Sequence, residues 1–453
     1  MIYICLFCFK QIESLQLFIS DSSFYSEIIL ILAEKMASCY QGCVFVLAMV
    51  VLALSTPCSH ALRIVKPKTR TSVFVSPKFV LEPGSVADKN YYDVNFPRGH
   101  IAIKSFNGEV IDEEGNPIPL HETYLHHWVV GKYYGRIGFV EPEDARFDEF
   151  QRSDFAFVRN SGVCQGDTNG QYFGIGSETR RTDTHVPDPF GIEVGNPAVV
   201  PAGYEERWLL NVHAIDTRGA ENGLGCTECR CDLYNVSTDS RGQPLRPGYK
   251  GGLRCCYDGT HCRVKQGFNG VKRNLYLRYT VKWVDWSDSI IPVKIYIFDV
   301  TDKMNRSAGL AIEHECRVEY DVEESCSETS DGCIDSQSSV VTMPTGGYVV
   351  YGVAHQHTGG IRSTLYGEDG RVLCSSIPIY GKGKEAGDEA GYIVGMSTCY
   401  PQPGSVKIND GETLTLVSNY SSSQTHTGVM DLFYVLVADY LPKSSVLSLD
   451  STL

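Results

Sequence analysis

The chain has 453 residues, which is more than one hydrophobic core usually holds, so we expect two domains. Its formal net charge is -14, with 40 Lys and Arg residues against 54 Asp and Glu residues. Nucleic acids and anionic membrane surfaces both attract basic proteins, so this balance excludes them as expected partners. The composition is otherwise typical of a globular protein.

The N-terminal part of the chain carries a targeting signal. Residues 44–54 form an apolar run that is too short to span a bilayer, and the small residues after it suit signal-peptide cleavage near Ala61. A second plausible start at Met36 makes residues 1–35 an extended or mis-assigned leader. We therefore assign residues 1–61 to a leader and signal peptide. We expect a secreted mature chain without a stable membrane anchor.

From Ser72 onward, short β-rich runs alternate with clusters of Gly, Pro and Asn. Long segments with helical periodicity are missing, which predicts an all-β protein built from β-sandwiches or jelly rolls. The expected strands lie in the runs 71–81, 100–106, 275–284, 293–300, 339–355, 413–420 and 431–440.

A polar stretch from Thr301 to Ser339 divides these strands into two groups. We place a domain boundary near Asn305, with an N-terminal β-sandwich domain at 72–305 and a C-terminal one at 306–441. Both are expected to be jelly-roll-like and to follow one another in tandem.

The 17 cysteines favour an oxidising compartment. Five belong to the leader, and the twelve that remain are an even number, which predicts complete disulfide pairing. Six of them crowd into residues 226–262, a Cys-rich insertion in the first domain. Paired thiolates at this spacing can also bind zinc, although disulfides are favoured in a secreted chain. Sequons at Asn235, Asn305 and Asn419 predict a glycoprotein.

Two histidines and a methionine stand in strand-like apolar runs of the second half. His355 and His357 occur in "YVVYGVAHQHTGG", and Met430 occurs in "THTGVMDLFYVLV". Side chains at i and i+2 of a strand point to the same face, so the two histidines can bind one metal together. The Met430 thioether is a soft donor that favours Cu(I), so this second ligand set predicts a redox copper site.

A first ligand set, His126, His127 and His213, occurs in "YLHHWVV" and "RWLLNVHAID". Adjacent strand residues normally face opposite ways, so joint binding by His126 and His127 requires a twist, a bulge or different ring nitrogens. A lone buried histidine is usually a hydrogen-bonded core residue, and a lone methionine usually fills an apolar gap. Only the joint pattern therefore indicates metal. The histidines left unassigned are His121, His185, His261 and His314.

Taken in chain order, these motifs resemble the copper-ligand motifs of the copper type II, ascorbate-dependent monooxygenases. That group contains peptidylglycine hydroxylating monooxygenase and dopamine β-monooxygenase, in which two jelly-roll domains each carry one copper. The resemblance implies that the first set holds the electron-transfer copper and the second set holds the copper that activates O2, with ascorbate as electron donor. It also implies that Tyr434 lines the substrate pocket, as a catalytic-site residue.

The mature chain as a whole resembles the plant stress up-regulated nodulin-type proteins, a family described by expression rather than by chemistry. It departs from the monooxygenases where their substrate-anchoring arginine stands before the His-x-His motif, because that position is Val353 here. Val353 shares a strand face with His355 and His357 and cannot bind a carboxylate. We therefore expect a neutral, apolar or hydroxylated small molecule as substrate, with Tyr434 available to bind it through a hydrogen bond.

The sequence thus predicts a secreted monooxygenase with two copper ions, which hydroxylates a C–H bond of a small organic substrate with O2 and ascorbate. The alternative from another class is a noncatalytic secreted double jelly roll with a binding or structural role in the stress response. A third interpretation is a single-copper protein that stores the metal. Copper content and O2 consumption distinguish the three.

Overall fold

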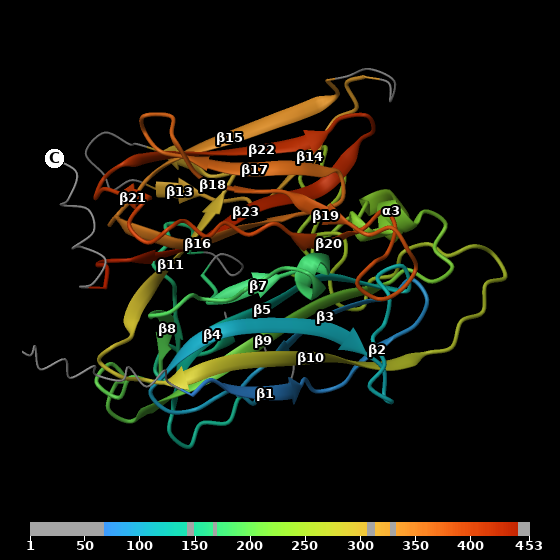
Figure 1. The fold of residues 1–453 in the computed structure, drawn as a ribbon. Coiled ribbons are helices and arrows are strands. Elements are labelled where there is room, and N and C mark those ends of the chain that lie inside the picture. The colour runs from blue at the N-terminus through green and yellow to red at the C-terminus, as the bar shows by residue number, and fades with distance from the viewer. Residues whose placement is uncertain (1–67, 143–148, 166–169, 306–312, 327–331, 443–453) are drawn as a thin grey trace, which may run out of the picture. The chain divides into compact units, whose positions relative to one another are not determined.

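The structure is a computed structural model that describes residues 68–142, 149–165, 170–305, 313–326 and 332–442. These residues form strands almost throughout, with only short helices, so the expected all-β class is confirmed (Figure 1). The expected leader and signal peptide at 1–61 lie outside the described residues. Within the described ranges, no helix has the length and apolar character needed to cross a bilayer.

One long sheet draws strands from both halves of the chain. Its order is β1-β10-β4-β8-β11-β23-β16-β21, with β2 paired to β10 and β14 paired to β23. The bounds of these strands are β1 (Arg70–Val75), β2 (Phe79–Leu81), β4 (Ile101–Ile111), β8 (Phe190–Val194), β10 (Arg273–Asp285), β11 (Ile291–Asp299), β14 (Glu319–Val322), β16 (Gly347–Gln356), β21 (Lys407–Ile408) and β23 (His426–Ala438).

Each half adds a sheet of its own. The N-terminal half contributes the order β3-β9-β5-β6, with β7 paired to β5. Its strands are β3 (Val86–Tyr91), β5 (Thr123–Arg136), β6 (Phe155–Val158), β7 (Phe173–Ile175) and β9 (Tyr204–Asp216). The C-terminal half contributes the order β15-β22-β17-β18. Its strands are β15 (Ile334–Thr342), β17 (Gly360–Tyr366), β18 (Val372–Ser376) and β22 (Thr413–Ser421).

The remaining elements are short. Strand β12 (Lys303–Asn305) pairs with β13 (Glu313–Glu315), and β19 (Pro378–Tyr380) pairs with β20 (Ile393–Met396). A 3-10 helix, η2 (Ser177–Arg180), follows β7, and the helices α3 (Gly223–Thr227) and α4 (Cys231–Tyr234) belong to the Cys-rich insertion.

Both halves are jelly-roll-like sandwiches with apolar cores. In the N-terminal half the fully buried Trp128 of β5 meets Phe106 and Phe173, whose rings stack with centroids 4.0 Å apart. In the C-terminal half β22 alternates buried and partly exposed residues, as expected for a sheet with one face on a core. Figure 1 shows the C-terminal strands layered over those of the N-terminal half.

Strand β23 is buried along all 13 residues because it is covered on both faces. On one face, Leu432 and Tyr434 line a cavity together with Val129 of β5. On the other face, Asp431 accepts a hydrogen bond from the Ser363 hydroxyl of β17, at 2.7 Å. A strand covered in this way carries an almost continuous apolar sequence, as "GVMDLFYVLVA" does.

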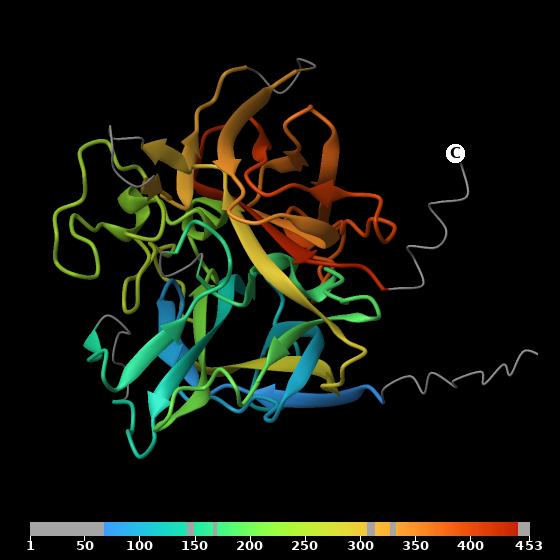
Figure 2. The ribbon, with the colours of Figure 1, turned by 90° about the vertical axis from the view of Figure 1, so that its left-hand side faces the viewer.

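The two halves are tied together by strand pairing and by a disulfide. Strand β11, which precedes the boundary expected near Asn305, pairs antiparallel with β23 and parallel with β8 (Figure 2). Cys164 of the N-terminal half is bonded to Cys316. Two domains with a boundary near Asn305 remain a prediction, and any boundary there must leave this shared sheet intact.

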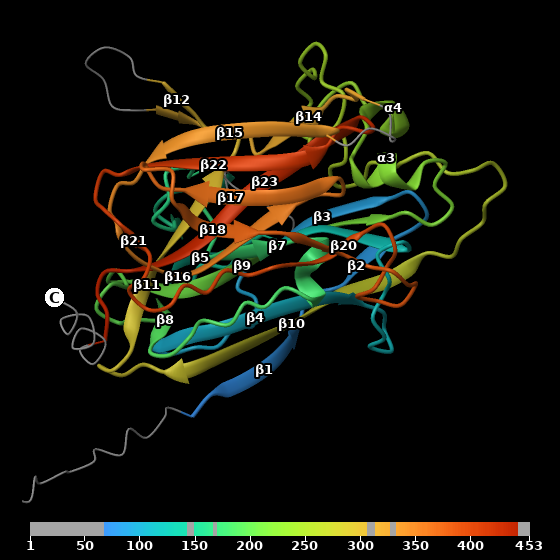
Figure 3. The ribbon, with the colours of Figure 1, turned by 45° about the horizontal axis from the view of Figure 1, so that its top comes forward.

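All twelve cysteines outside the leader are paired, as the even count predicts. Three of the six bonds lie inside the Cys-rich insertion, which leaves no thiolate there for zinc. The insertion packs against the start of β23, where the Thr427 hydroxyl donates to the Glu228 carbonyl at 3.1 Å (Figure 3). The pairs are Cys164–Cys316, Cys226–Cys262, Cys229–Cys256, Cys231–Cys255, Cys326–Cys333 and Cys374–Cys399.

Candidate metal centre

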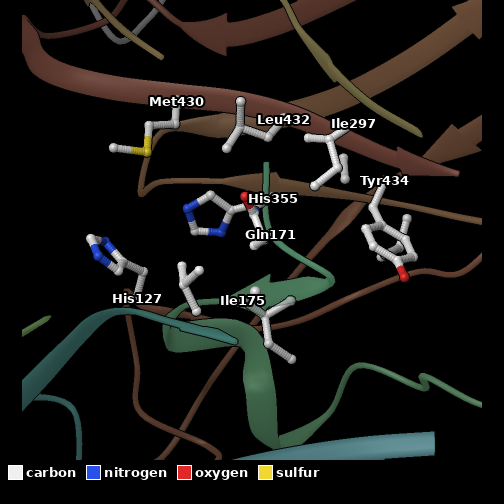
Figure 4. Close-up of a pocket in the computed structure, with 12 residues that line it drawn as sticks. His127, Gln171, Ile175, Ile297, His355, Met430, Leu432 and Tyr434 are labelled. Atoms are coloured by element: carbon white, nitrogen blue, oxygen red, sulfur yellow. The ribbon is translucent and has the colours of Figure 1, made fainter. Parts of the chain in front are cut away.

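The second ligand set lies where β16 ends against β23. In that ladder His355 is opposite Leu432, and Gln356 is opposite Asp431. The rings of His355 and His357 have centroids 5.1 Å apart, as side chains at i and i+2 on one strand face should. His355 and Met430 line the same small cavity (Figure 4). The structure therefore brings these buried side chains together, while copper binding by them stays a prediction.

The first ligand set is assembled by a β-bulge. In the pairing of β5 with β9, Leu125 is opposite Ala214 and His127 is opposite His213, so the register shifts at His126. The shift turns adjacent histidines toward one partner: the His213 ring centroid lies 4.6 Å from that of His126 and 5.0 Å from that of His127. A bulge is thus one of the devices that joint binding by neighbouring residues requires.

The two sets adjoin each other. The ring centroids of His126 and His357 are only 4.7 Å apart, with the ring planes nearly perpendicular. His127 also lines the cavity that His355 and Met430 share (Figure 4). Five histidine rings and one thioether therefore form one continuous cluster at the contact between the two halves.

Most of these rings have nitrogens without a hydrogen bond. Among the described residues, ten buried side-chain nitrogen or oxygen atoms have no partner, and five of them are ring nitrogens of this cluster. They are Nδ1 of His126, Nδ1 of His213, Nε2 of His355 and both ring nitrogens of His357. The Gly428 backbone lies close to His357 but outside hydrogen-bond geometry. Such atoms are rare in folded proteins, and bound metal is a standard reason for them.

Three groups outside the two sets fix which nitrogen each ring can offer. Glu178 of η2, which is fully buried, binds Nδ1 of His355 at 2.7 Å and leaves Nε2 available. The Cys256 carbonyl in the Cys-rich insertion binds Nε2 of His213 at 2.8 Å, and the Asn211 side chain binds Nε2 of His127 at 2.8 Å. Carboxylates and carbonyls that hold the second nitrogen in this way are typical of metal-binding histidines.

Gly176 lets η2 approach both sets. A Cβ atom at this position would lie 2.3 Å from the His126 carbonyl oxygen and 2.9 Å from Cε1 of His355. Any side chain would therefore displace the start of η2, and Glu178 with it. The Gly176 amide also donates to the second carboxylate oxygen of Glu178 at 3.0 Å, which orients that side chain toward His355.

Burial keeps most of the cluster neutral. Desolvation lowers the pKa of His126 and His357 well below the ordinary value, and it also lowers the pKa of His127 and His213. Burial acts on His355 in the same direction, but the charge and hydrogen bond of Glu178 outweigh it and raise the His355 pKa. Neutral imidazole is the form that binds metal, so four of the five rings are ready for it at neutral pH.

The cavity beside the second set has a volume of about 30 Å³ and mostly apolar walls. Val353 lines it, where the strand alternation puts it beside His355. Tyr434 lines it as well, at the end away from Met430 (Figure 4), but its hydroxyl donates to the Tyr172 carbonyl at 3.0 Å. The tyrosine that the resemblance places in the pocket is therefore present, with its proton already bound.

The donor set fits a soft, redox-active metal better than the alternatives. Imidazole suits copper and zinc, whereas the Met430 thioether suits Cu(I) and is a poor ligand for zinc, calcium or magnesium. Cys256 lies within reach of His126 and His213, but its sulfur is bonded to Cys229 and is not a thiolate. The second described cluster, Cys164, Asp299 and Cys316, also contains a disulfide and carries no such signal.

The unassigned histidines lie outside the cluster. His121, His185 and His261 are exposed, and His314 binds Asp302 at 2.7 Å. A further buried histidine, His426, has its Nδ1 bound to Glu228 at 2.5 Å. Sequence reasoning gave His426 and Glu178 no role, because neither belongs to a motif. A carboxylate paired with a histidine far along the chain becomes visible only after folding.

Comparisons with known proteins give a family and little more. The profile described as "Stress up-regulated Nod 19" matches residues 67–440. No curated protein matches the chain. Among solved structures, a protein of the Sputnik virophage has 9% identity and a TM-score of 0.19, covering 83% of this chain and 86% of that one. The VP2 subviral particle of infectious bursal disease virus has 9% identity and a TM-score of 0.15, with 82% and 72% covered. Likenesses this weak do not bear on function.

Proposed function

This chain belongs to the stress up-regulated Nod 19 family, and we propose that it is a secreted copper-dependent monooxygenase. It would hydroxylate a C–H bond of a small organic substrate with O2 and ascorbate. The first ligand set would hold one copper and the second set, with Met430, would hold the other. The pairing of all described cysteines supports an oxidising, extracellular compartment.

The observation that carries the proposal is the group of five buried, unpartnered ring nitrogens. A buried polar group without a hydrogen bond destabilises a fold by about 1–3 kcal/mol. Five such nitrogens in one cluster would be a heavy cost for a protein that only packs its core. Metal coordination removes this cost, because each nitrogen gains a ligand bond.

The surrounding residues do the work of preparing the site. Glu178, Asn211 and the Cys256 carbonyl hold three rings in one orientation, so the free nitrogens are fixed before metal arrives. The contact between the His126 and His357 rings leaves no room for a water layer between the two sets at that point. The apolar walls of the cavity exclude water from the side where the substrate would react.

Bound copper would cycle between Cu(II) and Cu(I) and supply the activation of O2. Overall, two ascorbate molecules would each give one electron and one proton. Together with O2 and the substrate C–H group, they yield a C–OH group and one water. Val353 offers no charge for a substrate carboxylate, so the proposed substrate is neutral.

The test is copper stoichiometry of the secreted protein, followed by O2 uptake in ascorbate after free copper has been removed. We expect two coppers per chain and ascorbate-dependent O2 uptake. The double variant His355→Ala with His357→Ala should keep one copper and lose the uptake. His426→Ala, which alters a buried histidine outside both sets, is the matched control and should keep both coppers.

Other outcomes assign the protein to another class. Absence of copper after reconstitution under reducing conditions would leave a noncatalytic secreted double jelly roll. One or two coppers without O2 uptake would indicate a protein that stores the metal.

A further inference from the structure

The cavity beside the second set contains one unexplained polar atom. The side-chain oxygen of Gln171 is buried and has no hydrogen-bond partner, and Gln171 is only 4% exposed. Gln171 lines the cavity with His355 and Tyr434 (Figure 4). The other unpartnered atom on this wall is Nε2 of His355, which the proposed function assigns to copper.

We propose that Gln171 binds the substrate by accepting a hydrogen bond from a hydroxyl or N–H group. Resting on the proposed function, this inference names the substrate class: a neutral molecule with an apolar body and one donor group. The donor would enter the cavity at Gln171, and a nearby C–H bond would face the second set. Gln171 is therefore the specificity-determining residue, a role that the sequence gave to Tyr434.

The surroundings explain why the acceptor is Gln171 rather than Tyr434. The Tyr434 hydroxyl donates its proton to the Tyr172 carbonyl at 3.0 Å and is held there. The Gln171 backbone is also held, because its carbonyl accepts from the Asn160 side chain at 2.8 Å. A fixed backbone with a free side-chain acceptor is what recognition of a single donor requires.

A trapped water is the simplest competing partner for this oxygen. The cavity volume of about 30 Å³ could contain one, but a buried water usually makes about three hydrogen bonds. The remaining walls are mainly aliphatic: Val129, Ile175, Ile297, Val353, Ala354 and Leu432. A donor that is part of an apolar molecule suits such walls better, because its body replaces the missing polar contacts with apolar ones.

The cavity accepts a functional group rather than a whole large molecule. Its small volume matches a hydroxyl-sized group. His127, Val129 and Gly174 on its wall are half-buried, so the cavity reaches toward solvent along β5 and β7. The body of the substrate would extend through this side.

The experiment uses the full-length, copper-free protein and two probes of nearly equal size, 4-methylphenol and 4-fluorotoluene. Fluorine replaces the hydroxyl without a donor, so the difference between their dissociation constants reports on the hydrogen bond alone. We expect the wild type to bind 4-methylphenol about tenfold more tightly, measured by ligand-observed NMR. Gln171→Leu should lose this preference while keeping the affinity for 4-fluorotoluene.

The matched control is Gln165→Leu, because the Gln165 side-chain oxygen is also buried and unpartnered but does not line the cavity. It should keep the tenfold preference. If Gln171→Leu does not fold, Gln171→Met takes its place. Equal binding of the two probes by the wild type, or a preference that survives at residue 171 variants, overturns the inference. A crystal soaked in 4-methylphenol that holds only a water at Gln171 overturns it too.

This design separates the two proposals. Probe binding is measured without copper, so failure of the Gln171 inference leaves the copper stoichiometry standing. Failure of copper binding in the wild type would in turn refute the proposed function without changing the probe result.

Discussion

Glu178 should control the affinity of the second copper although it is not a ligand. Its carboxylate holds Nδ1 of His355 at 2.7 Å with one oxygen and accepts the Gly176 amide at 3.0 Å with the other. In Glu178→Gln the side chain keeps its shape, but its NH2 group must face one of these two donors. The substitution therefore removes the negative charge and at least one hydrogen bond.

The size of the effect follows from the role of such partners. Loss of a carboxylate that orients a metal-binding histidine costs 10- to 100-fold in metal affinity, which is about 1.4–2.8 kcal/mol. We expect Glu178→Gln to bind one copper as tightly as the wild type and the other 10- to 100-fold more weakly. Anaerobic competition titration of Cu(I) against a chromophoric chelator measures both affinities.

The chain offers a matched control in Glu228, whose carboxylate binds Nδ1 of the buried His426 at 2.5 Å. Glu228→Gln perturbs the same kind of buried pair outside both ligand sets and should leave both affinities unchanged. Folded Glu178→Gln protein with two unaltered affinities would refute the reasoning. Equal weakening in both variants would mean that general destabilisation, and not ring orientation, is being measured.

Three further predictions concern other parts of the molecule. His355→Ala with His357→Ala should lower copper content from two ions to one in metal analysis, and a loss of both ions would mean that the two sets form a single site. A glycine-extended peptide should not be hydroxylated, because Val353 cannot bind its carboxylate, whereas efficient turnover that falls when the carboxylate is amidated would contradict this reading. Peptide mapping without reduction should find Cys164 bonded to Cys316 and no free thiol among the cysteines outside the leader, so a labelled thiol there would count against the pairing.

The strands were predictable where one face or both faces are apolar. The runs expected at 275–284 and 293–300 correspond to β10 (Arg273–Asp285) and β11 (Ile291–Asp299). Strand β15 was missed in its first half, because Ile334 to Ser338 lie in the stretch that polarity alone assigns to a separator. These residues are mainly exposed on the outer sheet, where packing places no apolar demand on the sequence.

The candidate site was visible in part for a similar reason. The six proposed ligands stand in short motifs on strands, so their grouping can be inferred from spacing and order. Glu178 is 177 residues away from His355, and a single glutamate in a loop region has no local pattern. The bulge at His126 was required by the proposal, but its location depends on pairing with β9, which the sequence does not encode locally.

The position of β23 at the end of the described fold has a consequence for biosynthesis. This strand supplies Met430, pairs with β11, β14 and β16, and is covered on both faces. A ribosome makes the chain from its N-terminus, so every other strand of the second set waits for β23 before it can be buried. We expect copper to enter this set only after residues 426–438 have emerged. A nascent chain stopped before His426 should accordingly bind copper through the first set at most, and binding of two ions by that chain would disprove this order.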